Sequence, residues 1–290
     1  MDQIDGVLSY SCDGTVAQIG LNRPKKRNAI NDQLIEALSV GIARANAEAK
    51  AAVLFGHGPH FCAGLDLAEH AERDALAGIR NSRRWHAVFA EMEFAPIPWV
   101  AALHGAVVGG GLEIACATHI RVAAAGAFFA LPEGQRGIYV GGGASVRLAR
   151  LIGPARMADM MLSGRVARAD EAERWGMVQY VTEADSEPAD EAFSDNDAAR
   201  ALAGAARIAR QAAGNAPFSN YAVIHALPRI QDMSREDGLM VEAMVASLAT
   251  GTEEAKARLR SFLDGRAGKV APDAPRQDGL GRESTDSGSA

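Results

Sequence analysis

The sequence contains few cysteines, few aromatic residues and no long apolar run. Its three cysteines, Cys12, Cys62 and Cys116, are an odd number and lack the short spacing of metal-ligand pairs, which argues against a disulfide framework. No segment approaches the roughly 18 consecutive apolar residues that a membrane-spanning helix needs. The N-terminus has neither the basic segment nor the apolar stretch of a secretion signal. We therefore expect a protein of the reducing cytoplasm that does not span a membrane.

Positive charge is also scarce relative to negative charge. Lys and Arg number 30 against 36 Asp and Glu, giving a formal net charge of −6. Such a balance provides no general attraction to nucleic acid or to anionic lipid, and we expect neither as a partner. The 290 residues are 48% hydrophobic, which is enough to build one large globular core or two small ones.

The first two thirds of the chain alternate between strand-like and helix-like patterns. Apolar runs predict strands over 16–21, 51–55, 99–104 and 120–123. Between and after these runs, helical spacing and capping residues predict helices over 31–47 and 154–162. This alternation indicates an α/β fold.

From about residue 198 the pattern is helical only. Helices are predicted over 198–213, 218–230, 235–249 and 253–264, separated by turn residues. We therefore expect an α/β core over 1–190, a helical region over 191–267 and a disordered tail over 268–290, where Pro, Gly, Ser and Asp dominate.

Two glycine triplets, Gly109 to Gly111 and Gly141 to Gly143, invite comparison with nucleotide-binding loops. Neither is followed by the Lys-Ser/Thr pair of a phosphate loop, and Ile114 and Val146 stand where a dinucleotide motif needs its last glycine. The first triplet lies between a predicted strand and a predicted helix starting at Leu112. Its backbone N–H groups suit a developing negative charge, although a lone glycine triplet more often reflects close helix-sheet packing.

Two glutamates in apolar or glycine-rich surroundings, Glu113 and Glu133, suit acid/base chemistry because burial raises the pKa of a carboxyl group. Each alone also fits a helix cap or a solvent-facing position. Asp66 could cap a helix. His57 and His60 lie three apart but lack a second ligand pair, so we predict no metal site.

Several motifs in order make the chain resemble the crotonase superfamily of enoyl-CoA hydratases and isomerases. The resemblance extends over residues 5–182 and weakens in the helical end. The motifs are Leu21-Asn22-Arg23-Pro24-Lys25-Lys26-Arg27-Asn28-Ala29-Ile30, Phe61-Cys62-Ala63-Gly64-Leu65-Asp66-Leu67, the segment from Ile97-Pro98 to Gly109-Gly110-Gly111-Leu112-Glu113, Leu131-Pro132-Glu133, 147–153, Ser163-Gly164 and Trp175-Gly176-Met177-Val178.

This resemblance implies a spiral of ββα units with a C-terminal helical region that builds a trimer, or a dimer of trimers. It implies an acyl-CoA thioester substrate and no separate cofactor. The N–H groups of Ala63 and Gly110 would bind the thioester oxygen. The residues implied to contact substrate or coenzyme A are Lys25, Ala63, Gly64, Leu65, Asp66 and Gly110.

By the same resemblance, Glu113 would act as base toward a water that attacks C3, and Glu133 would deliver a proton to C2. The expected reaction is reversible hydration of a trans-2-enoyl-CoA to a 3-hydroxyacyl-CoA. Trp85, Phe89 and Tyr139 would line the acyl pocket, although an aromatic stripe at helical spacing is more often core.

The chain departs from the family pattern near its C-terminus, where Arg266 follows Asp264-Gly265 and the usual coenzyme A-binding lysine is absent. Two other functions fit the same motifs. One is an enoyl-CoA isomerase or another enolate-forming acyl-CoA lyase or decarboxylase, which needs the oxyanion site and one principal base. The other is a non-catalytic acyl-CoA-binding or assembly protein.

Overall fold

The computed structural model describes residues 1–70, 74–183 and 195–266. Its main sheet has seven strands in the order β1-β2-β3-β4-β5-β7-β10. β1, β2 and β3 are antiparallel, and every pairing from β3 to β10 is parallel. The strands are β1 Asp2–Ile4, β2 Leu8–Cys12, β3 Val16–Leu21, β4 Ala51–Gly56, β5 Trp99–Leu103, β7 Ile120–Ala123 and β10 Tyr180–Val181.

A second, smaller sheet contains three strands of three residues each, in the order β6-β8-β9. They are β6 Ala106–Val108, β8 Phe128–Ala130 and β9 Val166–Arg168. β6 follows β5 after only two residues, and β8 follows β7 after four, so the chain passes directly from the large sheet to the small one. The glycine triplet Gly109 to Gly111 directly follows β6, and Glu133 follows β8 after two residues.

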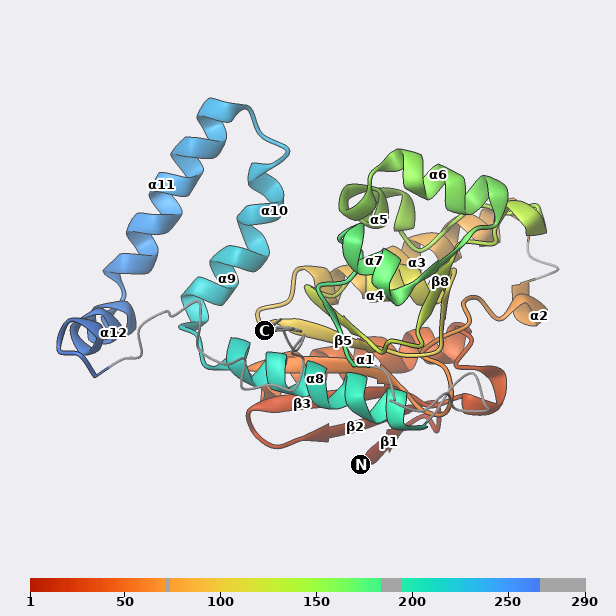
Figure 1. Ribbon diagram of the computed structural model, residues 1–290, viewed down its shortest axis with the longest axis horizontal. Coiled ribbons are helices and arrows are strands. Elements are labelled where there is room, and N and C mark those ends of the chain that lie inside the picture. The colour runs from red at the N-terminus through yellow and green to blue at the C-terminus, as the bar shows by residue number, and fades with distance from the viewer. Residues whose placement is uncertain (71–73, 184–194, 267–290) are drawn as a thin grey trace, which may run out of the picture.

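Helices surround both sheets (Figure 1). The first four helices of the chain are α1 Asp32–Glu48 between β3 and β4, α2 Leu67–His70 and α3 Ala75–Glu93 between β4 and β5, and α4 Gly110–Ala115 after β6. The remaining helices are α5 Ala144–Ile152, α6 Pro154–Ser163, α7 Ala169–Arg174, α8 Asp195–Ala213, α9 Pro217–His225, α10 Leu227–Ile230, α11 Arg235–Gly251 and α12 Glu253–Leu263. Two 3-10 turns, η1 Pro24–Lys26 and η2 Gly134–Arg136, complete the description.

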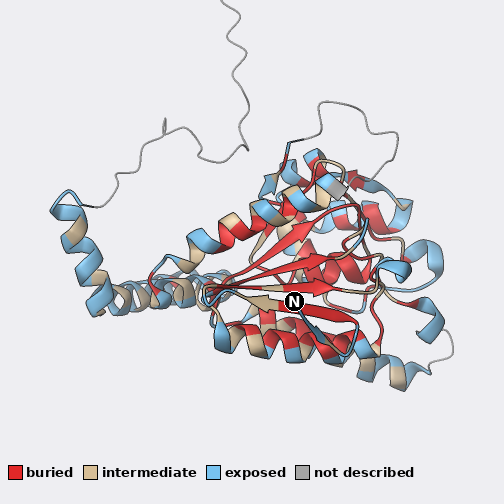
Figure 2. Ribbon diagram, turned by 90° about the horizontal axis from the view of Figure 1, so that it is seen from below, coloured by how far each residue is buried: buried red, intermediate tan, exposed pale blue. Residues whose placement is uncertain are grey.

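The central strands of the main sheet, such as β4 and β5, are buried and are drawn in red in Figure 2, whereas β1 and β10 at its edges are more exposed. One face packs into the larger core, which includes Leu34, Trp99 and Phe129. The other face is covered by α8, whose Ala201 and Ala205 are fully buried. Near-continuous apolar strands are therefore required, which is why 16–21, 51–55 and 120–123 were recognisable in the sequence.

The predicted boundary between the α/β core and the helical region lay between residues 190 and 191, and the position of α8 bears on it. That division assigned α8 to the helical region, whereas the structure packs it on β4 and β5 as a layer of the core. The helical extension begins at α9 and projects away from the core (Figure 1). The predicted helix 218–230 is divided into α9 and α10 before Pro228. The predicted tail, 268–290, lies outside the described residues.

The extension leaves large apolar side chains in solvent. Met240 and Leu248 on α11 are 65% and 61% exposed, and Leu263 on α12 is 81% exposed. Within the described ranges, no helix combines the length and the apolar character needed to cross a membrane.

Candidate active site

The loop Phe61–Asp66 lies between two extended segments of the chain. On one side, Ile30 N–H donates to the Gly64 carbonyl at 2.7 Å and Asp66 N–H donates to the Ile30 carbonyl at 2.9 Å. On the other side, Cys62 is bridged in parallel to Val107 of β6. The loop is therefore held as an extra strand segment at the edge of the small sheet, and its backbone direction is fixed.

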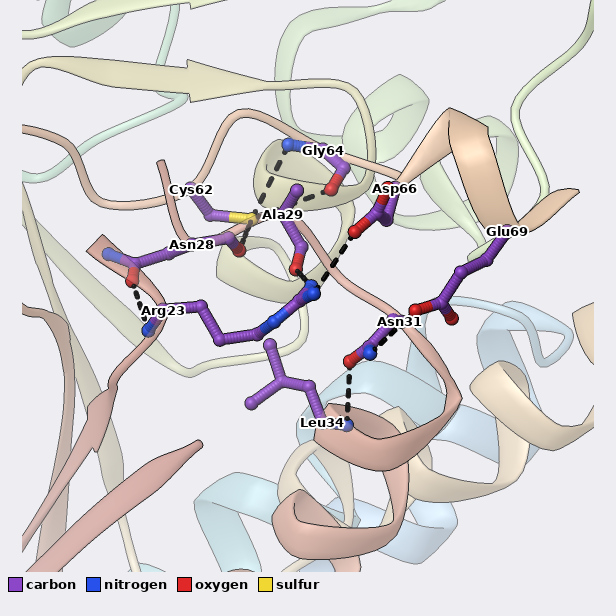
Figure 3. Close-up of polar contacts among 9 residues, drawn as sticks. All are labelled: Arg23, Asn28, Ala29, Asn31, Leu34, Cys62, Gly64, Asp66 and Glu69. Carbon is purple, nitrogen blue, oxygen red and sulfur yellow. Dashed lines mark hydrogen bonds and ion pairs between the residues drawn. The ribbon is translucent and has the colours of Figure 1, made fainter. Parts of the chain in front are cut away.

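Asp66 stabilises this loop through its side chain. Its carboxylate pairs with the Arg23 guanidinium at 3.1 Å, and both side chains are largely buried (Figure 3). Arg23 also donates to the Ala29 carbonyl. Asp66 was predicted to contact coenzyme A, but the structure directs its carboxylate into the protein, where it joins the loop to the segment before α1.

The backbone N–H groups of this loop differ in what they contact. Ala63 N–H donates to the Arg27 carbonyl at 2.9 Å, and Gly64 N–H points to Cys62 Sγ at 3.4 Å. Leu65 N–H has no hydrogen-bond acceptor in the described part of the chain. The Leu65 nitrogen lies 3.5 Å from the position that a Cβ on Gly110 would occupy. Leu65, and not the predicted Ala63, therefore has its N–H available beside Gly110.

The triplet Gly109 to Gly111 has no room for side chains. A Cβ on Gly109 would lie 2.7 Å from Glu133 Oε1, and one on Gly110 would lie 2.8 Å from Cζ3 of Trp85. Gly111 packs on the Cys62 carbonyl. Gly109 also has φ of +52° with ψ of −122°, a conformation that essentially only glycine adopts. Gly110 begins α4, so its N–H has no intrahelical acceptor.

Glu113, one turn into α4, is 3% exposed. Its Oε1 accepts hydrogen bonds from Gly142 N–H at 2.7 Å and from Ala144 N–H at 3.1 Å, at the start of α5. Burial raises the pKa of Glu113 above its ordinary value, while these backbone donors oppose the rise because they stabilise the carboxylate. The second triplet, Gly141 to Gly143, therefore supports the Glu113 carboxylate.

Glu133 follows β8 and is 7% exposed. Its Oε2 is buried and has no hydrogen-bond partner among the described residues. Burial raises the pKa of Glu133, and the negative charge of Glu113 raises it further. The two carboxyl groups therefore interact electrostatically.

Trp85 and Phe89, on the buried face of α3, pack beside these groups. Their ring centroids are 5.6 Å apart. Trp85 lies against Gly110, and Phe89 Cε2 is 3.1 Å from the position of a Cβ on Gly142. Tyr139, the third residue predicted for the acyl pocket, is 69% exposed. The structure thus brings two of the three predicted aromatic residues to the carboxyl pair and leaves Tyr139 at the surface of the described chain.

Other predicted residues lie at the periphery. Lys25 is exposed on the short turn η1. Arg266 pairs with Asp264 at the surface. His57 contacts Ser9 Oγ, whereas His60 accepts the Ala106 N–H. No group of three or more potential metal ligands occurs in the ranges that the structure describes.

Sequence reasoning missed Leu65 as a free donor and missed the anchoring of Glu113 by Gly142 and Ala144. A pattern of residues does not reveal which of several adjacent N–H groups is already bonded. The hydrogen bonds from Gly142 and Ala144 to Glu113 could have been suspected from the sequence. Gly141 to Gly143 precede a helical run, and exposed N–H groups at the start of a helix attract a carboxylate.

A loop with a free N–H, a glycine triplet that starts a helix and two buried glutamates together suit enolate chemistry on a thioester. Residues 11–264 match the family model of enoyl-CoA hydratase/isomerase. The chain belongs to this family, and its fold is the crotonase fold. It is thus an enzyme of the family whose substrates are acyl-CoA thioesters, as the resemblance predicted.

Individual relatives agree with this assignment. The chain is 30% identical over 257 residues to a short-chain-enoyl-CoA hydratase of Clostridium acetobutylicum, covering 88% of this chain and 93% of that protein. It is 30% identical over 261 residues to a 2,3-dehydroadipyl-CoA hydratase of Escherichia coli, covering 89% and 96%. The solved structure of a candidate enoyl-CoA hydratase from Rhodopseudomonas palustris is similar at 48% identity, with a TM-score of 0.82 and coverage of 91% and 97%.

Proposed function

We propose that the protein hydrates trans-2-enoyl-CoA thioesters reversibly to 3-hydroxyacyl-CoA. The observation that carries this proposal is the pairing of two buried carboxyl groups, Glu113 and Glu133, beside the Gly110 N–H. A hydratase needs two proton-transfer groups because a water must lose a proton while C2 gains one. An isomerase needs one principal base.

The surroundings of the two carboxyl groups suggest different roles. Glu113 accepts two backbone hydrogen bonds, which favour its ionised form and suit a base. Glu133 Oε2 has no described donor and sits near the charge of Glu113, which favours its protonated form and suits an acid. The water oxygen would bond to C3, its proton would pass to Glu113, and the proton of Glu133 would pass to C2.

We assign the binding of the thioester oxygen to the N–H groups of Leu65 and Gly110. A thioester enolate concentrates negative charge on this oxygen, and two prepositioned N–H donors in a dry site stabilise it. This assignment replaces Ala63, whose N–H donates to Arg27. Removal of one such donor typically costs about 10²–10³ in kcat.

The two ends of the substrate would meet different surfaces. Trp85 and Phe89 would contact the acyl group next to the carboxyl pair, because their rings pack against Gly110 and Gly142. Lys25, exposed on η1, would contact the coenzyme A phosphates, and Gly64 would allow the thioester to approach the loop closely. Coenzyme A enters as part of the substrate, and the proposed reaction uses no separate cofactor.

We also infer that the protein is a trimer, or a dimer of trimers. The extension α9–α12 projects from the core with exposed apolar side chains such as Met240, Leu248 and Leu263, and burying them requires another surface. A second copy of the chain fits this need. The expected location remains the cytoplasm.

The function is tested by the loss of conjugated-thioester absorbance when the purified protein meets crotonyl-CoA and then longer and aromatic enoyl-CoA esters. Hydration by the wild type, with loss in both Glu113→Gln and Glu133→Gln, supports the proposal. Retention of double-bond migration in Glu113→Gln but not in Glu133→Gln would indicate an isomerase. Binding of coenzyme A esters without turnover of any of them would indicate a non-catalytic protein.

A further inference from the structure

The loop that supports Glu113 is itself held by side chains outside the carboxyl pair. Ser82 Oγ, on α3, donates to the Gly141 carbonyl at 2.5 Å. Arg147 Nη1, on α5, donates to the Gly142 carbonyl at 3.0 Å. Two successive carbonyls of the loop are therefore bonded, while the N–H of Gly142 faces the other way and donates to Glu113 Oε1.

Arg147 is in turn fixed by α3. Its guanidinium pairs with the Glu93 carboxylate at 2.7 Å, and the Arg147 side chain is 11% exposed. Gly143 makes this arrangement possible, because its φ is +107° and a side chain there would overlap the Arg147 guanidinium. Ser82 and Glu93 lie at the middle and the end of the same helix. α3 thus holds the loop at two points.

We propose that Ser82 and the Glu93–Arg147 pair are positioning residues for Glu113. By fixing the Gly141 and Gly142 carbonyls, they orient the Gly142 and Ala144 N–H groups toward Glu113 Oε1. Ser82 is the more selective probe, since it is partly exposed and its removal creates no buried unpaired charge. The proposal rests on the proposed function insofar as Glu113 is the base.

Other charged or titratable groups also act on Glu113. His86, one turn beyond Ser82 on α3, approaches Ser82 Oγ at 3.4 Å and interacts electrostatically with Glu113. Glu133, just before η2, interacts electrostatically with Glu113, and Arg147 lies behind the loop on α5. Cys116, at the end of α4, is buried and its pKa is raised to about 11 by burial, so it stays neutral near pH 7.

The experiment compares Ser82→Ala and Glu93→Gln with Ser82→Thr, which keeps the hydroxyl, and with Arg83→Ala, an exposed neighbour on the same helix. Two quantities are measured. The first is kcat and KM for the enoyl-CoA ester that the wild type turns over best. The second is the titration of the Glu113 carboxyl carbon in protein labelled with 13C at Glu Cδ, assigned by its absence in Glu113→Gln.

For Ser82→Ala and Glu93→Gln we expect kcat to fall by roughly ten- to a hundredfold with KM changed by less than about threefold, as displacement of a reacting group predicts. The Glu113 titration midpoint should rise, because weaker N–H donation stabilises the carboxylate less. Ser82→Thr and Arg83→Ala should resemble the wild type.

An unchanged Glu113 titration in Ser82→Ala and in Glu93→Gln would overturn the proposal, whatever the stability of the variants. If the wild type hydrates no enoyl-CoA, the proposed function fails by itself. The titration in the labelled protein still decides whether Ser82 and Glu93 position Glu113.

Discussion

The Ala63 N–H donates a 2.9 Å hydrogen bond to the Arg27 carbonyl. This bond joins the loop Phe61–Asp66 to the segment before α1, whereas Leu65, two residues later, lies beside Gly110 and its N–H has no acceptor among the described residues. The Ala63 N–H therefore stabilises the loop, whereas the Leu65 N–H is available to a ligand.

Replacing single amides by esters separates these two roles. An ester at Leu65, introduced as the α-hydroxy acid, removes the N–H and also weakens the Gly64 carbonyl as the acceptor of the Ile30 N–H. We expect kcat to fall by about 10²–10³. An ester at Ala63 removes the bond to Arg27, and we expect a loss of roughly 1 kcal/mol in unfolding free energy with kcat preserved. Denaturant unfolding and steady-state kinetics measure the two effects. The reverse pattern would return the role of donor to Ala63.

Gly142 leaves no space for a methyl group beside Glu113. A Cβ there would lie 2.9 Å from Glu113 Oε2 and 3.1 Å from Phe89 Cε2. Gly142→Ala should displace the carboxylate and reduce kcat by roughly a hundredfold, the cost of a displacement of about 1 Å. Gly78→Ala is the control, because a Cβ on Gly78 meets nothing within 4 Å and α3 should gain up to about 1 kcal/mol in stability. Equal kcat values in the two variants would contradict the geometry.

Trp85 and Phe89 on α3 are expected to limit the size of the acyl group that the site accepts. Trp85 is 3% exposed and lies against Gly110, so Trp85→Leu should open space next to the thioester and shift kcat/KM toward bulkier enoyl-CoA esters. Trp175→Leu, at a half-buried position near Arg156 and Arg165, should leave the substrate preference unchanged. A ranking of esters that is the same in both variants would exclude Trp85 from the acyl pocket.

Burial gives Glu133 a raised pKa in the folded protein, and this links stability to pH. The folded state holds this proton more tightly than the unfolded state does. The contribution of Glu133 is therefore fully present below the pKa of an ordinary glutamate and is lost as pH rises through the raised value. Glu133→Gln should lose less stability than the wild type as pH rises from 4 to 8, with about 1.4 kcal/mol for each unit of raised pKa. Denaturant titrations across this range test the sign, and parallel curves would contradict it.

The proposed assembly predicts that the extension controls oligomeric state. Met244 and Leu248 on α11 are 56% and 61% exposed. A double substitution of both residues by Asp should convert a trimer into smaller species in sedimentation velocity. Val40→Asp, which changes an exposed apolar residue of α1, should not. A wild type that sediments as a monomer would remove the basis for this inference.

The sequence predicted the long elements of the fold better than the short ones. Strands 16–21 and 120–123 are confirmed because buried parallel strands are continuously apolar. The strands β6, β8 and β9 were missed, since three residues carry too little periodicity to recognise. α8 was predicted as a helix, but its sequence does not say that its small residues face the sheet, so its packing on β4 and β5 was not predicted.

In the candidate site, too, some features could be predicted from the sequence and others could not. Glu113 and Glu133 were identifiable because charged residues in apolar, glycine-rich surroundings are unusual. The contacts that distinguish them were not, since both the bonds from Gly142 and Ala144 and the unpaired Glu133 Oε2 depend on residues brought together from distant parts of the chain. Asp66 and Tyr139 were selected by resemblance alone, and their side chains lie elsewhere, in an ion pair and at the surface.

The most direct test of the central claim is a single-turnover reaction of crotonyl-CoA in water labelled with 18O, analysed by mass spectrometry. The account predicts one 18O in the 3-hydroxyl group of the wild-type product. It also predicts at least a hundredfold slower incorporation, by an order-of-magnitude estimate for a lost acid or base, in both Glu113→Gln and Glu133→Gln. A wild-type product without label, or full incorporation in either variant, would contradict a hydratase that works through this pair of glutamates.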